Sequence, residues 1–263
     1  MDYKIVKYPR TPHLEGSRLQ EGDEDLSQIP FKEILGKNIV IEEKIDGANS
    51  AVSFDANGNL LLQSRGHYLD GGYRERHYNL LKQWANINKD LLYSALGSRY
   101  IMYGEWMYSK HRVYYNRLPH YFIEFDIFDK DCNEFLDTGR RNAMLSGSSI
   151  VSAPVIFEGE LSDMKQLTSL IERSAYITDG HLLELREKAI ALGLDPEVIL
   201  DETDKTCLVE GLYIKLEERG RVTGRLKYVR AGYTQARAIS DGDWSNRKII
   251  ENGLADGLDF FEA

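Results

Sequence analysis

The segment at residues 43–49, Glu-Lys-Ile-Asp-Gly-Ala-Asn, carries residue types that suit nucleophilic chemistry. It follows the apolar run at 39–41, so Lys44 would stand at the end of a buried strand. Free lysine has a pKa of about 10.4 and must lose a proton before its amine can attack phosphorus. We expect burial and nearby cations to lower the pKa of Lys44, Asp46 to orient its neighbours, and Gly47 to admit a ligand close to the backbone. The alternative is a simple turn, because Asp-Gly is a common hairpin dipeptide.

Composition limits the class of protein. The chain has 263 residues, of which 42% are hydrophobic and 29% charged, as in ordinary globular proteins. A formal net charge of −9 argues against a protein that coats nucleic acid non-specifically, although a local basic groove is compatible with it. Cys132 and Cys207 have neither a metal-ligand spacing nor a disulfide framework, so we expect reduced thiols. With no secretory signal and no long apolar run, the sequence predicts a cytoplasmic protein that does not interact with a membrane.

The hydrophobic pattern predicts an α+β protein dominated by antiparallel strands. We expect strands at residues 38–43, 50–55, 60–64, 100–105, 121–128, 208–216 and 221–229, and helices at 79–96, 137–146, 161–173 and 179–192. A single domain would span 1–263, with 1–30 as an N-terminal arm and 129–206 as a helical insert. Neither of the two common glycine-rich nucleotide loops is present in the sequence, so any nucleotide must be held in another way.

Six short motifs follow one another along the chain. They are Glu-Lys-Ile-Asp-Gly-Ala-Asn at 43–49, Ser-Arg-Gly at 64–66, Tyr-Gly-Glu-Trp at 103–106, Phe-Ile-Glu-Phe-Asp-Ile-Phe at 122–128, Glu-Gly-Leu-Tyr-Ile-Lys at 210–215 and Arg-Leu-Lys at 225–227. This ordered series resembles the covalent nucleotidyltransferase superfamily, which comprises polynucleotide ligases and mRNA capping enzymes. Within it the chain most resembles RNA ligases of the T4 RNA ligase 2 type. The resemblance implies an adenylation fold of antiparallel sheets flanked by helices, an ATP-grasp-like ligase core.

The resemblance also implies a reaction in three steps. A lysine takes AMP from ATP, the AMP passes to an RNA 5′-phosphate, and an RNA 3′-OH then displaces it. Lys44 matches the nucleophile, and Lys227 and Arg225 resemble paired cations that neutralise the α-phosphate. Arg225 stands where the family usually has lysine, which keeps the charge on a wider group. The expected role is RNA repair, with a kinase or phosphatase as a possible partner that prepares the ends.

Two glutamates resemble family residues that bind the ribose and a metal ion. Glu105 is similar to the ribose contact, and Glu210 to a residue that holds a divalent ion through its water ligands. We expect both to serve a Mg²⁺ or Mn²⁺ ion, because Mg²⁺ is commonly bound by one or two carboxylates together with substrate phosphates.

The resemblance places further residues at the nucleotide. Phe125 would stack on adenine, with Phe122 and Phe128 as alternatives, and strand alternation places Phe125 on the face opposite both. Glu42 and Glu43 are expected beside the nucleotide, with Glu42 accepting a hydrogen bond from the adenine amino group.

The resemblance also concerns the ribose, the RNA end and the choice of substrate. Arg65 resembles an arginine that contacts the ribose or the RNA 5′-phosphate, and Lys215 matches a basic position of the family. Asn49 favours an RNA ligase, since DNA ligases and capping enzymes usually carry arginine there. Only 230–263 follows the last motif, so we expect neither an oligonucleotide-binding fold nor a helical C-terminal domain.

Two other functions remain open at this point. One is a DNA ligase-like enzyme that seals nicks, and the other is a catalytically silent RNA-binding module. A capping guanylyltransferase is less favoured, because it normally needs the accessory fold.

Overall fold

The computed structural model describes residues 5–19, 27–233 and 248–261. Within these residues twelve strands form one sheet, whose main path runs β10-β3-β11-β12-β8-β7-β6-β4-β5 with every neighbouring pair antiparallel. The strands of this path are β3 (Ile39–Lys44), β4 (Ala48–Phe54), β5 (Leu60–Ser64), β6 (Tyr100–Trp106), β7 (Phe122–Asp129), β8 (Glu134–Leu136), β10 (Val155–Gly159), β11 (Gly211–Glu218) and β12 (Arg221–Val229). The α+β class and the seven predicted strands are confirmed, with strand ends displaced by at most three residues.

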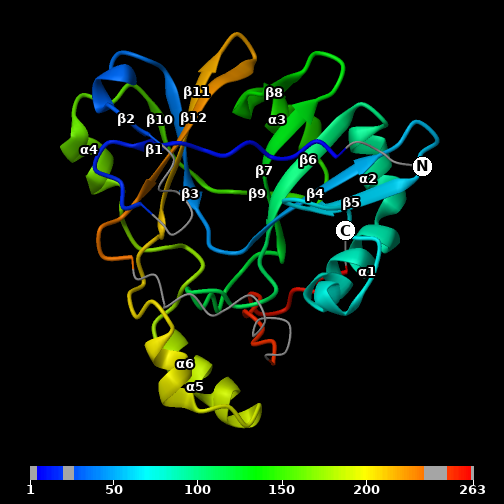
Figure 1. Cartoon of the computed structure of the whole chain (residues 1–263), viewed down its shortest axis with the longest axis vertical. Coiled ribbons are helices and arrows are strands. Elements are labelled where there is room, and N and C mark those ends of the chain that lie inside the picture. Colours follow the sequence, from blue (N-terminus) through cyan, green and yellow to red (C-terminus); the bar gives the residue numbers. More distant parts are fainter. Residues whose placement is uncertain (1–4, 20–26, 234–247, 262–263) are drawn as a thin grey trace.

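Three short strands lie off this path. β1 (His13–Leu14) pairs in parallel with β12 and with β2 (Gln28–Ile29), and β9 (Val151–Ser152) pairs in parallel with β7. Residues 5–12 contain no helix or strand and run across the sheet toward β12 (Figure 1). The rest of the predicted arm, 1–4 and 20–26, lies outside the described residues.

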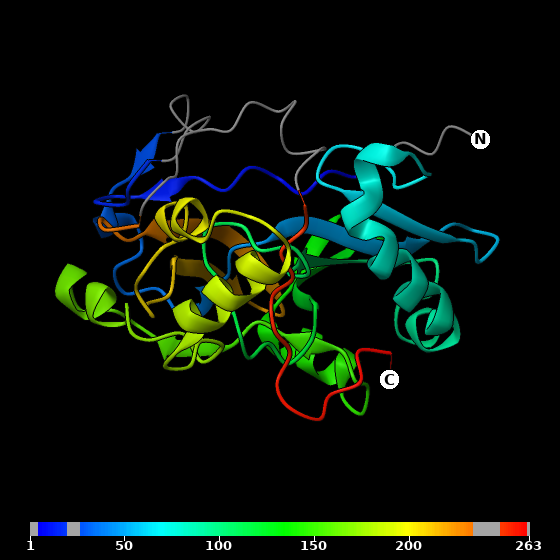
Figure 2. The same ribbon diagram turned by 90° about the horizontal axis from the view of Figure 1, so that it is seen from below.

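The described helices form separate groups around the sheet. They are α1 (Asn79–Ile87), α2 (Lys89–Leu96), α3 (Thr138–Leu145), α4 (Met164–Ser169), α5 (His181–Ala191) and α6 (Pro196–Asp201), with short 3-10 turns η1 (Phe31–Glu33) and η2 (Tyr73–Tyr78). The pair α1–α2 lies apart from the pair α5–α6 in both views (Figure 1, Figure 2). No helix within the described ranges has the length and apolar composition needed to cross a bilayer.

The single helix predicted at 79–96 is two helices. Asn88 leaves helical geometry at φ −96° and ψ 19°, and its side-chain amide donates to the Trp84 carbonyl over 3.1 Å. This local hydrogen bond competes with the continuing helix, which explains the break.

The expectation that 129–206 is a helical insert is wrong in part. The segment contains α3 to α6, but it also supplies β8, β9 and β10 to the sheet. β10 is an edge strand whose residues are mostly exposed or half-buried. Its apolar run at 155–157 is only three residues long, shorter than the runs of four or more that indicate a strand, so this strand was not predicted.

Strand alternation decides which side chains of β3 face the core. Ile39 and Ile41 pack with Leu212 and Ile214 of β11 in one hydrophobic cluster. Because successive side chains point to opposite faces, Lys44 at the end of β3 lies on the other face. The buried cluster therefore fixes the register that presents Lys44.

Candidate active site

The sheet register gathers most of the predicted charged residues on one face. In β3 and β11, Lys44 lies opposite Gly211 and Glu42 lies opposite Tyr213. In β11 and β12, Tyr213 lies opposite Lys227, and Lys215 lies opposite Arg225. Directly paired residues share a face of a sheet, so these side chains all belong to the face that carries Lys44.

Lys44 forms an ion pair with a buried carboxylate. Its Nζ donates to Oε2 of Glu210 over 2.8 Å, and the Glu210 side chain is 1% exposed. Burial by itself would lower the pKa of Lys44, but Glu210, Glu105 and Asp46 outweigh it and raise the pKa above its ordinary value. The expectation of a lowered pKa is therefore wrong for this state, because the groups that dominate the electrostatics of Lys44 are carboxylates.

Asp46 anchors the connection between β3 and β4. Its Oδ2 accepts hydrogen bonds from the backbone amides of Arg112 (2.7 Å) and Val113 (3.0 Å). Its own amide donates to the Tyr115 hydroxyl over 3.0 Å. β3 and β4 do not pair with each other. The simple hairpin turn that Asp-Gly could have formed is therefore excluded.

Gly47 and Glu105 are in direct contact. The Gly47 amide donates to Oε1 of Glu105 over 3.1 Å. A Cβ on Gly47 would lie 2.7 Å from both the Trp106 carbonyl oxygen and Met107 Sδ, so a larger residue does not fit there. Burial raises the pKa of Glu105 to about 8, with Asp46 and Glu210 adding to the rise and Lys44 opposing it.

A cavity of about 840 Å³ opens beside this motif. It brings together three of the predicted site residues, Asn49, Arg65 and Glu105, together with Gly47. Asn49 on β4 lies directly opposite Glu105 on β6. Arg65 follows the end of β5 and is exposed, so its guanidinium group is available to a ligand.

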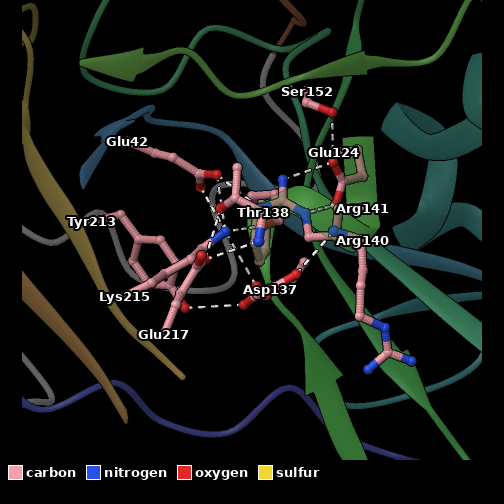
Figure 3. A network of polar contacts seen from close by, with 12 residues as sticks. Glu42, Glu124, Asp137, Thr138, Arg140, Arg141, Ser152, Tyr213, Lys215 and Glu217 are labelled. Atoms are coloured by element: carbon pink, nitrogen blue, oxygen red, sulfur yellow. Dashed lines mark hydrogen bonds and ion pairs between the residues drawn. The ribbon is translucent and has the colours of Figure 1, made fainter. Parts of the chain in front are cut away.

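Glu42 and Lys215 belong to a buried ion network rather than to the cavity wall (Figure 3). Lys215 is 0% exposed, and its Nζ lies 2.9 Å from a Glu42 oxygen and 3.2 Å from Oδ1 of Asp126. Both residues were predicted to bind the nucleotide. In this structure they form an ion pair with each other on the face that carries Lys44.

Arg141 completes the network and was not predicted. From α3 it donates to Glu42 over 2.8 Å and to both oxygens of Glu124 over 2.8 Å (Figure 3). Burial would lower the pKa of Arg141, but Glu124 and Glu42 raise it well above its usual range. The only sequence signal was a basic pair after Asp137, whose side chain caps α3 by accepting from the Arg140 amide.

Arg225 is held by a carboxylate and an aromatic ring. Its Nε lies 3.3 Å from Oδ2 of Asp126, and its guanidinium carbon lies 3.5 Å from the centre of the Phe135 ring. The Tyr8 hydroxyl of the N-terminal segment donates to the same Asp126 oxygen over 2.5 Å. Lys227 is half-buried two residues further along β12, and its amide donates to the Pro12 carbonyl over 3.0 Å.

The three phenylalanines of β7 do not alternate as expected. The register shifts between Tyr103 and Gly104 of β6, which leaves Phe125 as the extra residue of a bulge. Phe122 is fully buried and stacks on Trp84, whereas Phe125 and Phe128 are half-buried and contact one common aromatic cluster. The expectation that Phe125 faces away from both neighbours is therefore wrong for Phe128.

Glu43 is buried on the opposite side of β3 from Lys44. It is 4% exposed, and its Oε1 has no hydrogen-bond partner among the described residues. Burial raises the pKa of Glu43 to about 7, although a hydrogen bond with Ser174 lowers this pKa and offsets part of the rise. A buried charged acceptor without a partner is costly, which agrees with the raised pKa of this carboxyl group.

The donor set suits a hydrated divalent cation. Glu210, Glu105 and Asp46 all interact with the Lys44 ammonium group, and burial favours the neutral form of Glu105 when no further cation is near it. No cluster of three or more His, Cys, Asp or Glu residues with metal-binding geometry occurs in the described part of the chain. Mg²⁺ commonly takes one or two carboxylates and completes its shell with water and substrate phosphate, so Glu210 and Glu105 fit it.

Comparison with known proteins gives matches to one family and one fold. A sequence profile of the RNA ligase family matches residues 37–229. A mutant RNA ligase of Naegleria gruberi with ATP and Mn matches with a TM-score of 0.54 and 15% identity, over 87% of this chain and 57% of that chain. An archaeal ATP-dependent RNA ligase matches with a TM-score of 0.47 and 16% identity, over 87% of this chain and 49% of the other. A search of curated proteins found no match.

These matches differ in what they establish. The present chain spans about half the length of the solved ligases that it matches. At 15% identity, the Naegleria structure shows a shared fold. The profile covers more than half of the sequence, and the matched range includes all six motifs. The chain belongs to the RNA ligase family.

Proposed function

We propose that this protein is an ATP-dependent RNA ligase that carries AMP on Lys44. The observation that carries the proposal is the Lys44 amine, paired with Glu210 over 2.8 Å at the end of β3 and electrostatically coupled to Glu105, which lines the cavity. An amine placed beside a cavity is the group that a covalent transfer of AMP needs. The Naegleria ligase of the same fold was solved with ATP and Mn, which supports the choice of nucleotide and of a divalent ion.

The first step requires Lys44 to lose a proton. The raised pKa keeps the resting amine protonated, and its hydrogen bond leads to Glu210, which we propose as the proton acceptor. The neutral Nζ then attacks the α-phosphorus of ATP, a nitrogen–phosphorus bond forms, and the bond to the bridging oxygen breaks to release pyrophosphate. A divalent ion held at Glu210 and Glu105 would supply charge neutralisation at the phosphates.

The next two steps transfer AMP and seal the strand. An oxygen of the RNA 5′-phosphate attacks the adenylyl phosphorus, and the nitrogen–phosphorus bond to Lys44 breaks as the amine regains a proton. The RNA 3′-OH then attacks the 5′-phosphorus, loses its proton, and releases AMP. Lys227 and Arg225 lie on the face that carries Lys44, and we propose that Lys227 contacts the α-phosphate while Arg225 is fixed beside it by Asp126.

The sheet register bears on the proposed adenine contact. Glu42 and Glu43 each keep one carboxylate oxygen without a hydrogen-bond partner among the described residues, but Glu42 lies on the face of β3 that carries Lys44 and Glu43 lies on the opposite face. We therefore propose Glu42 as the acceptor for the adenine amino group, and Phe125, which is half-buried, as the stacking ring. Lys215 and Arg141 form ion pairs with Glu42 and hold it in place.

The substrate is proposed to be RNA with a 5′-phosphate and a 3′-OH, in a repair reaction whose ends a kinase or phosphatase prepares.

Labelled nucleotide tests the proposal directly. The protein is incubated with α-labelled ATP or α-labelled GTP and Mg²⁺, with pyrophosphatase present, and separated on a denaturing gel. Label from ATP alone is the expected result, and its loss in Lys44→Arg assigns the attachment. Label from GTP would indicate a capping guanylyltransferase, and no label from either would indicate a silent RNA-binding module.

A further inference from the structure

The cavity lined by Glu105 extends beyond the residues predicted to contact the nucleotide. Its inner part is lined by Gly47, Asn49 and Glu105. Its outer part extends past Arg65 to η2, where it is lined by Tyr73 and His77. The resemblance already places Arg65, in the second motif, at the ribose or the RNA 5′-phosphate, but none of the six motifs includes the residues of η2.

The outer wall exposes an aromatic ring. Tyr73 is 63% exposed, although it lines the cavity. It follows Gly71 and Gly72, whose φ values of 127° and 124° are accessible mainly to glycine. The Arg76 guanidinium lies 5.4 Å from the Tyr73 ring centre and donates to its hydroxyl over 3.3 Å. An exposed aromatic ring on a fixed wall is a platform on which a nucleic-acid base can stack.

η2 is anchored to the core. The Trp106 indole, which is 1% exposed, donates to the His77 carbonyl over 2.7 Å. At the other end of the turn, Glu75 accepts from the Gly71 amide over 3.0 Å and from Lys82 over 2.5 Å. The wall that carries Tyr73 is therefore held from both sides.

The charges along the outer wall suit a phosphate. Arg65 is exposed and can form two parallel hydrogen bonds with phosphate oxygens. The carboxylate of Glu75 is 2.5 Å from the Lys82 ammonium and 3.8 Å from His67, so its negative charge is compensated.

We propose that the outer part of this cavity binds the RNA nucleotide that bears the 5′-phosphate, with the phosphate at Arg65 and its base stacked on Tyr73. This inference rests on the proposed ligase function and names where its RNA substrate enters. The 5′-phosphate then lies on the side of the cavity that leads to Glu105 and Lys44, where it must receive AMP.

Binding of short RNA without ATP tests the site separately from the chemistry. Three probes carry fluorescein at the 3′ end: a single-stranded RNA with a 5′-phosphate, the same RNA with a 5′-OH, and a 5′-phosphorylated RNA whose terminal nucleotide lacks its base. Fluorescence anisotropy gives the dissociation constants for wild type, Tyr73→Ala, Tyr73→Phe and Arg65→Gln. Tyr93→Ala, at a tyrosine of α2 that is 43% exposed, is the matched control.

Wild type should bind the 5′-phosphate RNA more tightly than the 5′-OH RNA, and Arg65→Gln should remove that difference. Tyr73→Ala should weaken binding of the intact RNA by about tenfold or more, as expected for the loss of one stacked base. It should not weaken binding of the RNA that lacks the terminal base. Tyr73→Phe, which keeps the ring, and Tyr93→Ala should bind like wild type.

Two results would overturn the inference. One is an equal loss for the intact and the base-free RNA in Tyr73→Ala, which would make the tyrosine a structural residue. The other is a wild-type affinity that does not depend on the 5′-phosphate, which would assign the cavity to another part of the RNA. Neither result concerns the adduct on Lys44, so failure of the site and failure of the proposed ligase function are distinguishable.

Discussion

At the scale of single residues, the site depends on carboxylates whose charge is controlled by burial. Glu210 is charged and paired with Lys44, whereas burial favours the neutral form of Glu105 and Glu43 near neutral pH. The same environment that favours the protonated form of Lys44 keeps its amine from reacting before the nucleotide arrives. Two residue substitutions test this description.

Glu43→Gln should change how stability depends on pH. Folding raises the pKa of Glu43 from 4.5 to about 7, so between these values the folded protein binds more protons than the unfolded chain. The stability contributed by the neutral carboxyl is complete below pH 4.5 and is lost as the pH rises through 7. Since glutamine stays neutral, the variant should be more stable than wild type at pH 8 by about 1–3 kcal/mol, and similar to it near pH 4.5. Denaturant unfolding at both pH values measures this, and an equal pH dependence in both proteins would contradict it.

Gly47→Ala should destabilise the motif that carries Lys44. The new Cβ would meet a backbone carbonyl oxygen at 2.7 Å, where no flexible side-chain end can move aside. Such overpacking typically costs about 1–3 kcal/mol. Gly66→Ala is the control, because its Cβ would meet nothing within 4 Å. The midpoint of thermal unfolding should fall for the first variant alone, and an equal change in both would refute the steric argument.

At the scale of elements, the insert between β7 and β11 is part of the site's support. α3 delivers Arg141 to Glu42 on β3, a residue 99 positions away in sequence, and to Glu124 on β7. The network thus connects β3, the strand that carries Lys44, with β7. β10 adds a further attachment by pairing with β3.

Arg141→Met should be far more damaging than loss of the α3 cap. Removing one partner of a buried ion pair leaves uncompensated charge and costs about 3–5 kcal/mol, whereas Asp137→Ala, which removes the N-cap, should cost about 1 kcal/mol. Denaturant unfolding of both variants compares the two values. Equal costs would show that Arg141 acts only through the stability of α3.

Some of this arrangement could be predicted from the sequence and some could not. The apolar run at 39–41 predicted β3 to within one residue, and with it the place of Lys44. The bulge at Phe125 was not predictable, because it depends on the register between β6 and β7. Arg141 carried no local signal of burial, since its partners are acids on distant strands. The pKa of Lys44 was predicted in the wrong direction because the prediction considered burial and cations, whereas Glu210, Glu105 and Asp46, which the same motifs contain, outweigh burial.

At the scale of the whole molecule, a chain with a net charge of −9 should bind RNA through few contacts. Each neutralised phosphate of a single strand changes the logarithm of affinity by about 0.7 per logarithm of salt. With Arg65 and a small number of further cations, we expect a slope of about 1–2. Titration of the 5′-phosphate RNA at several salt concentrations measures the slope. A slope above about 4 would require an extended basic surface and contradict a local site.

The measurement that tests the account most directly is the mass of the Lys44 peptide. The protein is purified, incubated with ATP, Mg²⁺ and pyrophosphatase, digested, and compared with Lys44→Arg treated in the same way. The account predicts a mass increase of one adenylyl group on the wild-type peptide that contains position 44, and no increase in the variant. An unmodified wild-type peptide, or an adenylyl group on another residue, would contradict it.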